Sequence, residues 1–132
     1  MSSVYYTPPV LAIGLCSLVL DDLMQRGGVA WADEQCRCRS SQMYELLDAS
    51  NGFYTVPAPR ALRSRVAIVF RLKDANLGPL FHKEAAKRQL YQLENHPSVG
   101  GLRACLYNSV EDEAFACLMQ FLYDFKKQYG AQ

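Results

Sequence analysis

The residues best suited to binding chemistry lie in one short segment, 95–103, which reads Asn-His-Pro-Ser-Val-Gly-Gly-Leu-Arg. Gly100 and Gly101 let the backbone approach another group closely, because glycine has no side chain. Arg103 opens the apolar run that follows, and its planar guanidinium suits a bidentate grip on a carboxylate. The segment is compatible with an anion site. The alternative is that Arg103 pairs with a carboxylate of the protein and that His96 is an ordinary loop residue.

The remaining candidates for chemistry carry weaker signals. The sequence holds no phosphate-binding, dinucleotide-binding, serine-hydrolase or zinc-protease motif. Its five cysteines include one C-x-C at 36–38 with no second pair or histidine cluster to match, so we expect free, buried thiols and no metal site. His82 lies early in a predicted helix, where an exposed or half-buried surface residue is the expectation.

Two predicted strands would position the 95–103 segment. Residues 65–72 alternate in a pattern that leaves both faces largely apolar, which indicates a central strand with cover. Residues 102–107 form the strand that begins with Leu102 and carries Arg103. Shorter β-prone runs occupy 53–56 and 91–93.

Four predicted helices complete the chain, at 10–26, 29–49, 79–89 and 111–129. The first is apolar on nearly every side, which is typical of a helix buried against a neighbour. In the second, the predicted packed side consists of Trp31, Gln35, Cys38, Met43, Leu46 and Leu47. Arg39 is among the residues expected to face solvent. The order α-α-β-β-α-β-β-α predicts an α+β fold: a small, mostly antiparallel sheet with helices packed on one face.

Composition narrows the classes of partner. The 132 residues include 14 basic and 13 acidic side chains, for a formal net charge of +1. This balance does not favour nucleic acid or an acidic membrane surface. The longest apolar stretch, 8–20, is short for a membrane span and has no basic segment before it. We expect a cytoplasmic protein.

Several ordered motifs resemble those of one family, the phosphoserine aminotransferases. Residues 95–108 are similar to the family signature G-H-R-S-V-G-G-[IM]-R-A-S-[IL]-Y-N. Residues 6–9 resemble its N-T-P-P, and residues 50–54 its S-x-G-F-Y. Residues 63–71 resemble R-S-x-M-N-[IV]-x-F-R, and residues 81–85 resemble F-x-x-E-A. The motifs cover essentially the whole chain in the family's order.

The resemblance implies a class V, fold-type I aminotransferase that uses pyridoxal phosphate and forms a homodimer with active sites at the subunit interface. Its reaction moves an amino group between glutamate and 3-phosphohydroxypyruvate, giving phosphoserine and 2-oxoglutarate in serine biosynthesis. By the same resemblance, residues 1–27 match the end of the large domain with an interdomain helix, and residues 28–132 match the carboxy-terminal small domain.

Three site residues carry over from the family motifs. Arg103 matches the arginine that holds the substrate α-carboxylate, and His96 matches a histidine near the substrate phosphate. Thr7 matches a threonine that binds the cofactor phosphate from the neighbouring subunit. The resemblance places the Schiff-base lysine upstream of this chain, so we expect no catalytic residue here and no pyridoxal phosphate bound by this chain alone. The expected partner is a large cofactor-binding domain or a second subunit.

Two positions depart from the family pattern. Pro97 stands where the signature has an arginine that contacts phosphate, and proline offers neither charge nor N–H. Tyr6 stands where the family has asparagine. Two hypotheses follow. Either the chain is the carboxy-terminal domain of an aminotransferase and is inactive alone, or it is a degenerate, non-catalytic domain that acts as a scaffold or interaction subunit.

Overall fold

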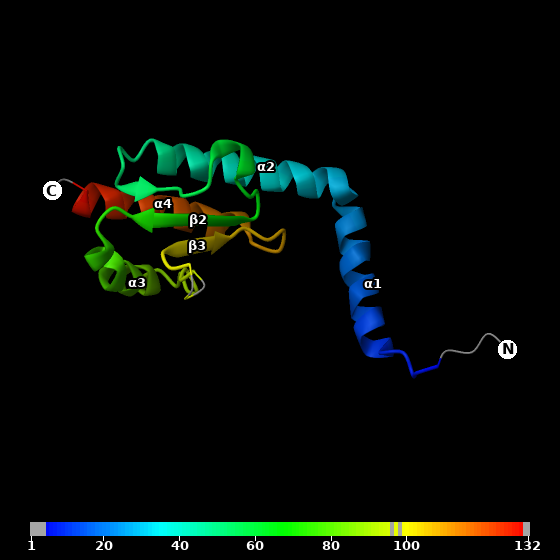
Figure 1. Ribbon diagram of the computed structural model, residues 1–132. Coiled ribbons are helices and arrows are strands. Elements are labelled where there is room, and N and C mark those ends of the chain that lie inside the picture. The colour runs from blue at the N-terminus through cyan, green and yellow to red at the C-terminus, as the bar shows by residue number, and fades with distance from the viewer. Residues whose placement is uncertain (1–4, 96, 98, 131–132) are drawn as a thin grey trace. The chain divides into compact units, whose positions relative to one another are not determined.

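The computed structural model describes residues 5–95, 97 and 99–130, in two compact units: one ends at Glu34 and the other begins at Gln35. The first unit contains helix α1, Val10–Gln25, and the first residues of α2, Gly28–Asp48 (Figure 1). Gly27 and Gly28 separate the helices with φ values of 115° and 66°, a conformation that glycine adopts without strain. Both predicted helices are therefore confirmed to within one or two residues.

Helix α1 differs from an ordinary surface helix because none of its residues is buried. Its large exposed apolar residues are Val10, Leu11, Ile13, Leu15, Leu18, Val19, Leu20 and Met24. None of the described helices combines the length and apolar character needed to cross a membrane.

The second unit is built on a three-stranded antiparallel sheet in the order β1-β2-β3. The strands are β1, Tyr54–Thr55, β2, Ala67–Leu72, and β3, Leu102–Cys105. Strand β2 is central, as predicted. Short 3-10 helices occupy Arg60–Leu62 and Ala75–Leu77, and the longer helices after the sheet begins are α3, Gly78–Lys87, and α4, Asp112–Tyr129.

The core lies on one face of this sheet, as predicted. Ile68 and Phe70 of β2 point into it and are fully buried. Helix α4 lies alongside β2 and β3 in Figure 1 and contributes an apolar stripe of Phe115, Leu118, Phe121, Leu122 and Phe125. The ring of Phe81 from α3 packs 4.9 Å from that of Phe121 and 5.0 Å from that of Phe125. Edge-to-face aromatic contacts therefore join α3 to α4.

The turn between α2 and β1 is fixed by a buried serine. Ser50 is 1% exposed, and its hydroxyl accepts a hydrogen bond from the backbone N–H of Tyr54 at 2.9 Å and donates one to the Tyr54 carbonyl at 3.1 Å. The Tyr54 hydroxyl donates to the Leu122 carbonyl at 2.9 Å and ties β1 to α4. This turn therefore fixes where the first strand enters the sheet.

Three predictions were wrong in detail. Residues 91–93 form no strand: Gln92 has a φ of 58°, which interrupts an extended chain, and the described residues there give one bridge, between Glu94 and Leu102. The cysteines are free but not buried: Cys16 and Cys38 are exposed, and Cys36, Cys105 and Cys117 are half-buried. Arg39 is 7% exposed rather than solvated, since a terminal nitrogen lies 2.7 Å from an Asp112 carboxylate oxygen and joins α2 to the start of α4.

The turn serine gives a first testable prediction. Ser50→Ala leaves the buried N–H and carbonyl of Tyr54 without their side-chain partner, and a buried unsatisfied polar group costs roughly 1–3 kcal/mol. We expect a loss of that size in the free energy of unfolding, measured by urea denaturation. Ser41→Ala, at an exposed position of α2, is the matched control. Equal losses in the two variants would contradict the role given to Ser50.

A second prediction concerns acid stability. Hydrogen bonds from Arg63 at 2.8 Å, with a further one from Arg60, hold the pKa of Asp48 below its ordinary value of 3.8. A lowered carboxyl pKa contributes stability that is fully present above about pH 4 and is lost as the pH falls through the folded-state value.

The measurement is the free energy of unfolding between pH 7 and pH 2. Asp48→Asn removes the contribution, so its deficit relative to the unmodified chain shrinks as the pH falls below about 4. Ser41→Ala on the same helix changes no ionisable group, so this control should show no such convergence. A deficit of Asp48→Asn that stays constant with pH would refute the pairing.

Candidate functional site

The position of Arg103 follows from the alternation of β3. Leu102 and Ala104 are 3% and 2% exposed and point into the core, so Arg103 and Cys105 lie on the opposite face of the sheet, where they are half-buried. The register places Val69 of β2 directly opposite Arg103. Arg103 thus lies on the sheet face that the helices leave uncovered.

The chain before β3 is held against the strand by backbone contacts. Arg103 N donates to the Leu93 carbonyl at 2.8 Å, and Asn95 N donates to the Gly101 carbonyl at 3.1 Å. The Asn95 side-chain amide adds a 3.0 Å bond to the Gly100 carbonyl. These bonds close a loop, residues 94–101, whose base lies beside the candidate arginine.

Glycine is required where this loop meets β2. Gly101 has a φ of 77°, and a Cβ at that position would lie 2.8 Å from Arg71 Cγ and 2.9 Å from the Phe70 carbonyl oxygen. Real Cβ atoms do not approach backbone so closely, so a larger residue would displace the loop. The prediction that the glycines permit close approach is met here by approach of the loop to its own sheet.

The guanidinium of Arg103 differs from most others in its electrostatic surroundings. A carboxylate oxygen lies within 3.1 Å of a guanidinium nitrogen in each of Arg26, Arg39, Arg60, Arg63 and Arg88. Arg103 has no such partner among the residues that the structure describes, and its Nε is buried without a hydrogen bond. Arg39 and Arg63 also have a buried Nε without a partner, but their terminal nitrogens are ion-paired. The alternative that Arg103 is neutralised internally is therefore not supported.

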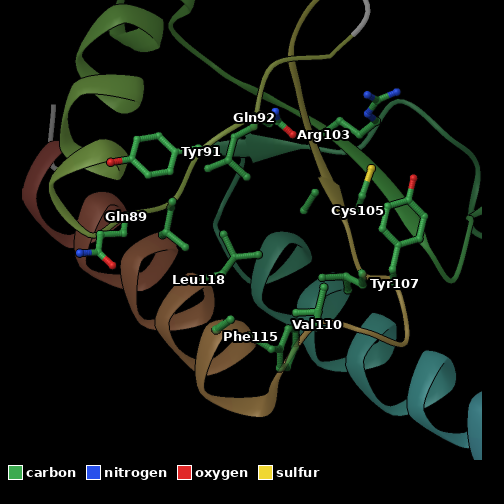
Figure 2. Close-up of a pocket in the computed structure, with 14 residues that line it drawn as sticks. Gln89, Tyr91, Gln92, Arg103, Cys105, Tyr107, Val110, Phe115 and Leu118 are labelled. Atoms are coloured by element: carbon green, nitrogen blue, oxygen red, sulfur yellow. The ribbon is translucent and has the colours of Figure 1, made fainter. Parts of the chain in front are cut away.

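Two cavities border the candidate arginine and the loop. The larger, about 410 Å³, is lined on its apolar side by residues of α4 such as Phe115 and Leu118. Figure 2 shows Arg103 and Cys105 on β3 and Tyr107 in the segment that follows it, with the Arg103 guanidinium directed away from Phe115 and Leu118. The smaller cavity, about 240 Å³, has a lining of Arg71, Leu72, Ala75, Gly78, His82, Gly101 and Leu102.

His82 is half-buried, as expected, at the rim of the smaller cavity. Its Nδ1 lies 3.3 Å from a carboxylate oxygen of Glu94. The nearest acidic side chain of the loop is therefore engaged with a histidine. No group of three or more potential metal ligands occurs in the part of the chain that the structure describes.

The structure places the other predicted site residues in no relation to Arg103. His96 lies outside the described residues. Thr7 is exposed and belongs to the first unit, next to Tyr6, whose ring meets that of Tyr5 at 4.7 Å. Pro97 is exposed in a turn of the loop. The roles assigned to Arg103, His96 and Thr7 remain predictions.

Pyridoxal phosphate forms a Schiff base with a lysine. No lysine lines the two cavities beside Arg103 and the loop. Lys87 is paired with Glu84 at 2.7 Å, and the Lys126 ammonium donates to the Ala49 carbonyl at 3.0 Å. Lys73, Lys83 and Lys127 are exposed. We therefore derive no chemical step through the cofactor from this chain.

One residue that sequence reasoning left without a role stands beside the site. Arg71 of β2 lies on the same sheet face as Arg103, and a terminal nitrogen donates to the Val99 carbonyl of the loop at 3.2 Å. The alternation of residues 67–72 already indicates that Arg71 lies on the face opposite Ile68 and Phe70. That it shares this face with Arg103 follows only when the pairing of β2 with β3 is known.

Comparison with known proteins gives a consistent result. No family model matches the chain. "Phosphoserine aminotransferase 2, chloroplastic" of Arabidopsis thaliana is 37% identical over 129 residues, which are 98% of this chain and 31% of that protein. A phosphoserine aminotransferase of Geobacillus kaustophilus is 38% identical over 129 residues, or 98% and 36% of the two chains. The chain thus spans about a third of the length of these relatives.

Solved structures agree with the sequence comparison. The phosphoserine aminotransferase from Bacillus circulans subsp. alkalophilus superposes with a TM-score of 0.89 at 36% identity, over 94% of this chain and 34% of that one. The enzyme from Trichomonas vaginalis gives a TM-score of 0.82 at 29% identity, over 91% and 34%. Together with the α+β architecture and the ordered motifs, these matches show that the chain is homologous, along nearly all of its length, to the carboxy-terminal third of the phosphoserine aminotransferases.

Proposed function

We propose that this chain forms the substrate-carboxylate side of a phosphoserine aminotransferase active site. The reaction transfers an amino group between glutamate and 3-phosphohydroxypyruvate and yields phosphoserine and 2-oxoglutarate. The observation that carries the proposal is the guanidinium of Arg103, which lies on the uncovered sheet face and has no ion-pair partner among the described residues. The relatives named phosphoserine aminotransferase support the choice of reaction.

In this proposal Arg103 binds and orients the α-carboxylate of each amino acid or keto acid. A guanidinium presents paired N–H donors in one plane, which matches the two oxygens of a carboxylate and fixes the substrate's rotation as well as its position. The backbone bonds of Leu93 and Asn95 to β3 restrict the segment that carries the arginine. Orientation of this kind lowers the entropic part of the barrier.

The cofactor and the reactive lysine belong, in this proposal, to the part of the relatives that this chain does not cover. Helix α1 supports such a partner, since it offers apolar side chains and buries none of them. A large domain of the same protein or of a second subunit would cover them. The chain alone is then inactive.

A second candidate function rests on the substitutions in the site motifs. Pro97 and Tyr6 replace, relative to the family signature, residues able to contact an anion. A degenerate aminotransferase domain that serves as a scaffold would tolerate both changes. It would associate with a larger protein without needing the cofactor.

A chimera tests the two candidates. Joining this chain to the amino-terminal part of the Geobacillus kaustophilus relative, in place of the matching residues, supplies the missing region. We expect an internal-aldimine absorbance band with pyridoxal phosphate and transfer from glutamate to 3-phosphohydroxypyruvate. The unjoined chain should show neither. A chimera that folds and binds cofactor but transfers nothing would favour the scaffold.

The role of Arg103 is tested in the same chimera. Arg103→Ala removes the donors to the α-carboxylate, and hydrogen bonds to charged groups are worth roughly 1.5–3 kcal/mol each. We expect kcat/KM to fall by about tenfold to a hundredfold for every amino-acid substrate. Arg88→Ala, which breaks an ion pair with Asp124, is the control and should change kcat/KM little. Equal kinetics for Arg103→Ala and the unmodified chimera would place the site elsewhere.

A further inference from the structure

A second arginine shares the uncovered sheet face with Arg103. Val69 is directly opposite Arg103, so Arg71, two residues further along β2, is its diagonal neighbour on that face. Diagonal neighbours in an antiparallel pair are about 7–8 Å apart, a separation that long side chains easily span. The two guanidinium groups can therefore approach one ligand from adjacent strands.

The Arg71 side chain is directed along the loop. The Arg71 Cγ lies so close to Gly101 that a Cβ at that position would collide with it. One terminal nitrogen of Arg71 donates to the Val99 carbonyl at 3.2 Å. A guanidinium has five N–H donors, so most remain open after this bond. Arg71 is exposed and borders the 240 Å³ cavity that Gly101 also lines. Arg71 thus places a guanidinium with available N–H donors at the base of the loop that contains Pro97.

The charge balance at this place lacks a counterion. Neither Arg71 nor Arg103 has a carboxylate within ion-pair distance among the residues that the structure describes, whereas five other arginines do. Glu94, the acid of the loop, lies against His82 instead. Two neighbouring cations repel each other, and a bound anion relieves that repulsion.

We propose that Arg71 and Arg103 form a two-guanidinium site for a substrate with two acid groups. Arg103 takes the α-carboxylate, and Arg71 takes the second acid group: the phosphate of phosphoserine or the side-chain carboxylate of glutamate. The naming of these substrates rests on the proposed function. Arg71 then supplies a cation near Pro97, where the family signature has an arginine.

The test uses the full chain and two probes that differ by one acid group, O-phospho-L-serine and L-serine. Binding is followed by NMR on the Nε–H signals of the arginines. We expect phosphoserine to shift the signals of Arg71 and Arg103 along one saturable curve, and serine to shift that of Arg103 alone. Arg71→Gln should weaken phosphoserine binding by about tenfold or more and change serine binding less than twofold.

Two further variants separate recognition from support of the loop. Arg71→Lys keeps the charge and should retain part of the phosphoserine affinity that Arg71→Gln loses. Arg60→Gln, one of the two arginines on Asp48, is the control and should leave both affinities unchanged. An unshifted Arg71 signal with phosphoserine, or equal weakening of both probes by Arg71→Gln, overturns the proposal. So does an affinity for phosphoserine no greater than for serine.

The outcome is distinguishable from that of the proposed function. A chimera without transfer activity, combined with coupled phosphoserine shifts at both arginines in the chain, removes the aminotransferase role and keeps the anion site. An active chimera combined with an unshifted Arg71 removes the second arginine and keeps the reaction.

Discussion

The burial of Leu102 and Ala104 determines which face of the sheet Arg103 occupies. Leu102 and Ala104 are held in the core, and because successive side chains of a strand alternate between faces, the residue between them must point the other way. The hydrophobic effect thus orients a cation without any polar contact to that cation. A shift of β3 by one residue would place Arg103 in the core and the leucine outside.

This register is itself maintained from several sides. Four residues of β3 pair with four residues of β2. On the other edge of β3, the Leu93 carbonyl accepts a hydrogen bond from the N–H of Arg103. The ring of Phe70 on β2 packs against that of Phe81, which connects the paired strands to the aromatic cluster of the core. The two arginines of the uncovered face therefore lie on hydrogen-bonded strands rather than on a loop. A binding group placed on strands loses less freedom when it meets its ligand than one placed on a loop.

The sequence allowed the helices, the central strand and the one-sided core to be predicted, because apolar runs and the glycines and prolines that bound them mark these elements. It did not reveal that residues 91–93 lack a strand, since glutamine gives no sequence signal for the left-handed conformation that Gln92 adopts. The burial of Arg39 depends on Asp112, 73 residues away, and no periodicity reports such a pair. Arg103 was found from its motif, whereas Arg71 needed the strand register.

Helix α1 has a consequence for the physical behaviour of the chain by itself. A helix whose apolar side chains surround its axis has no side that prefers water, and exposed patches of that kind drive association. If only the folded form associates, association stabilises that form, and the stabilisation increases with protein concentration. The melting temperature of the isolated chain should then rise with its concentration, and it would describe an assembly rather than a lone polypeptide.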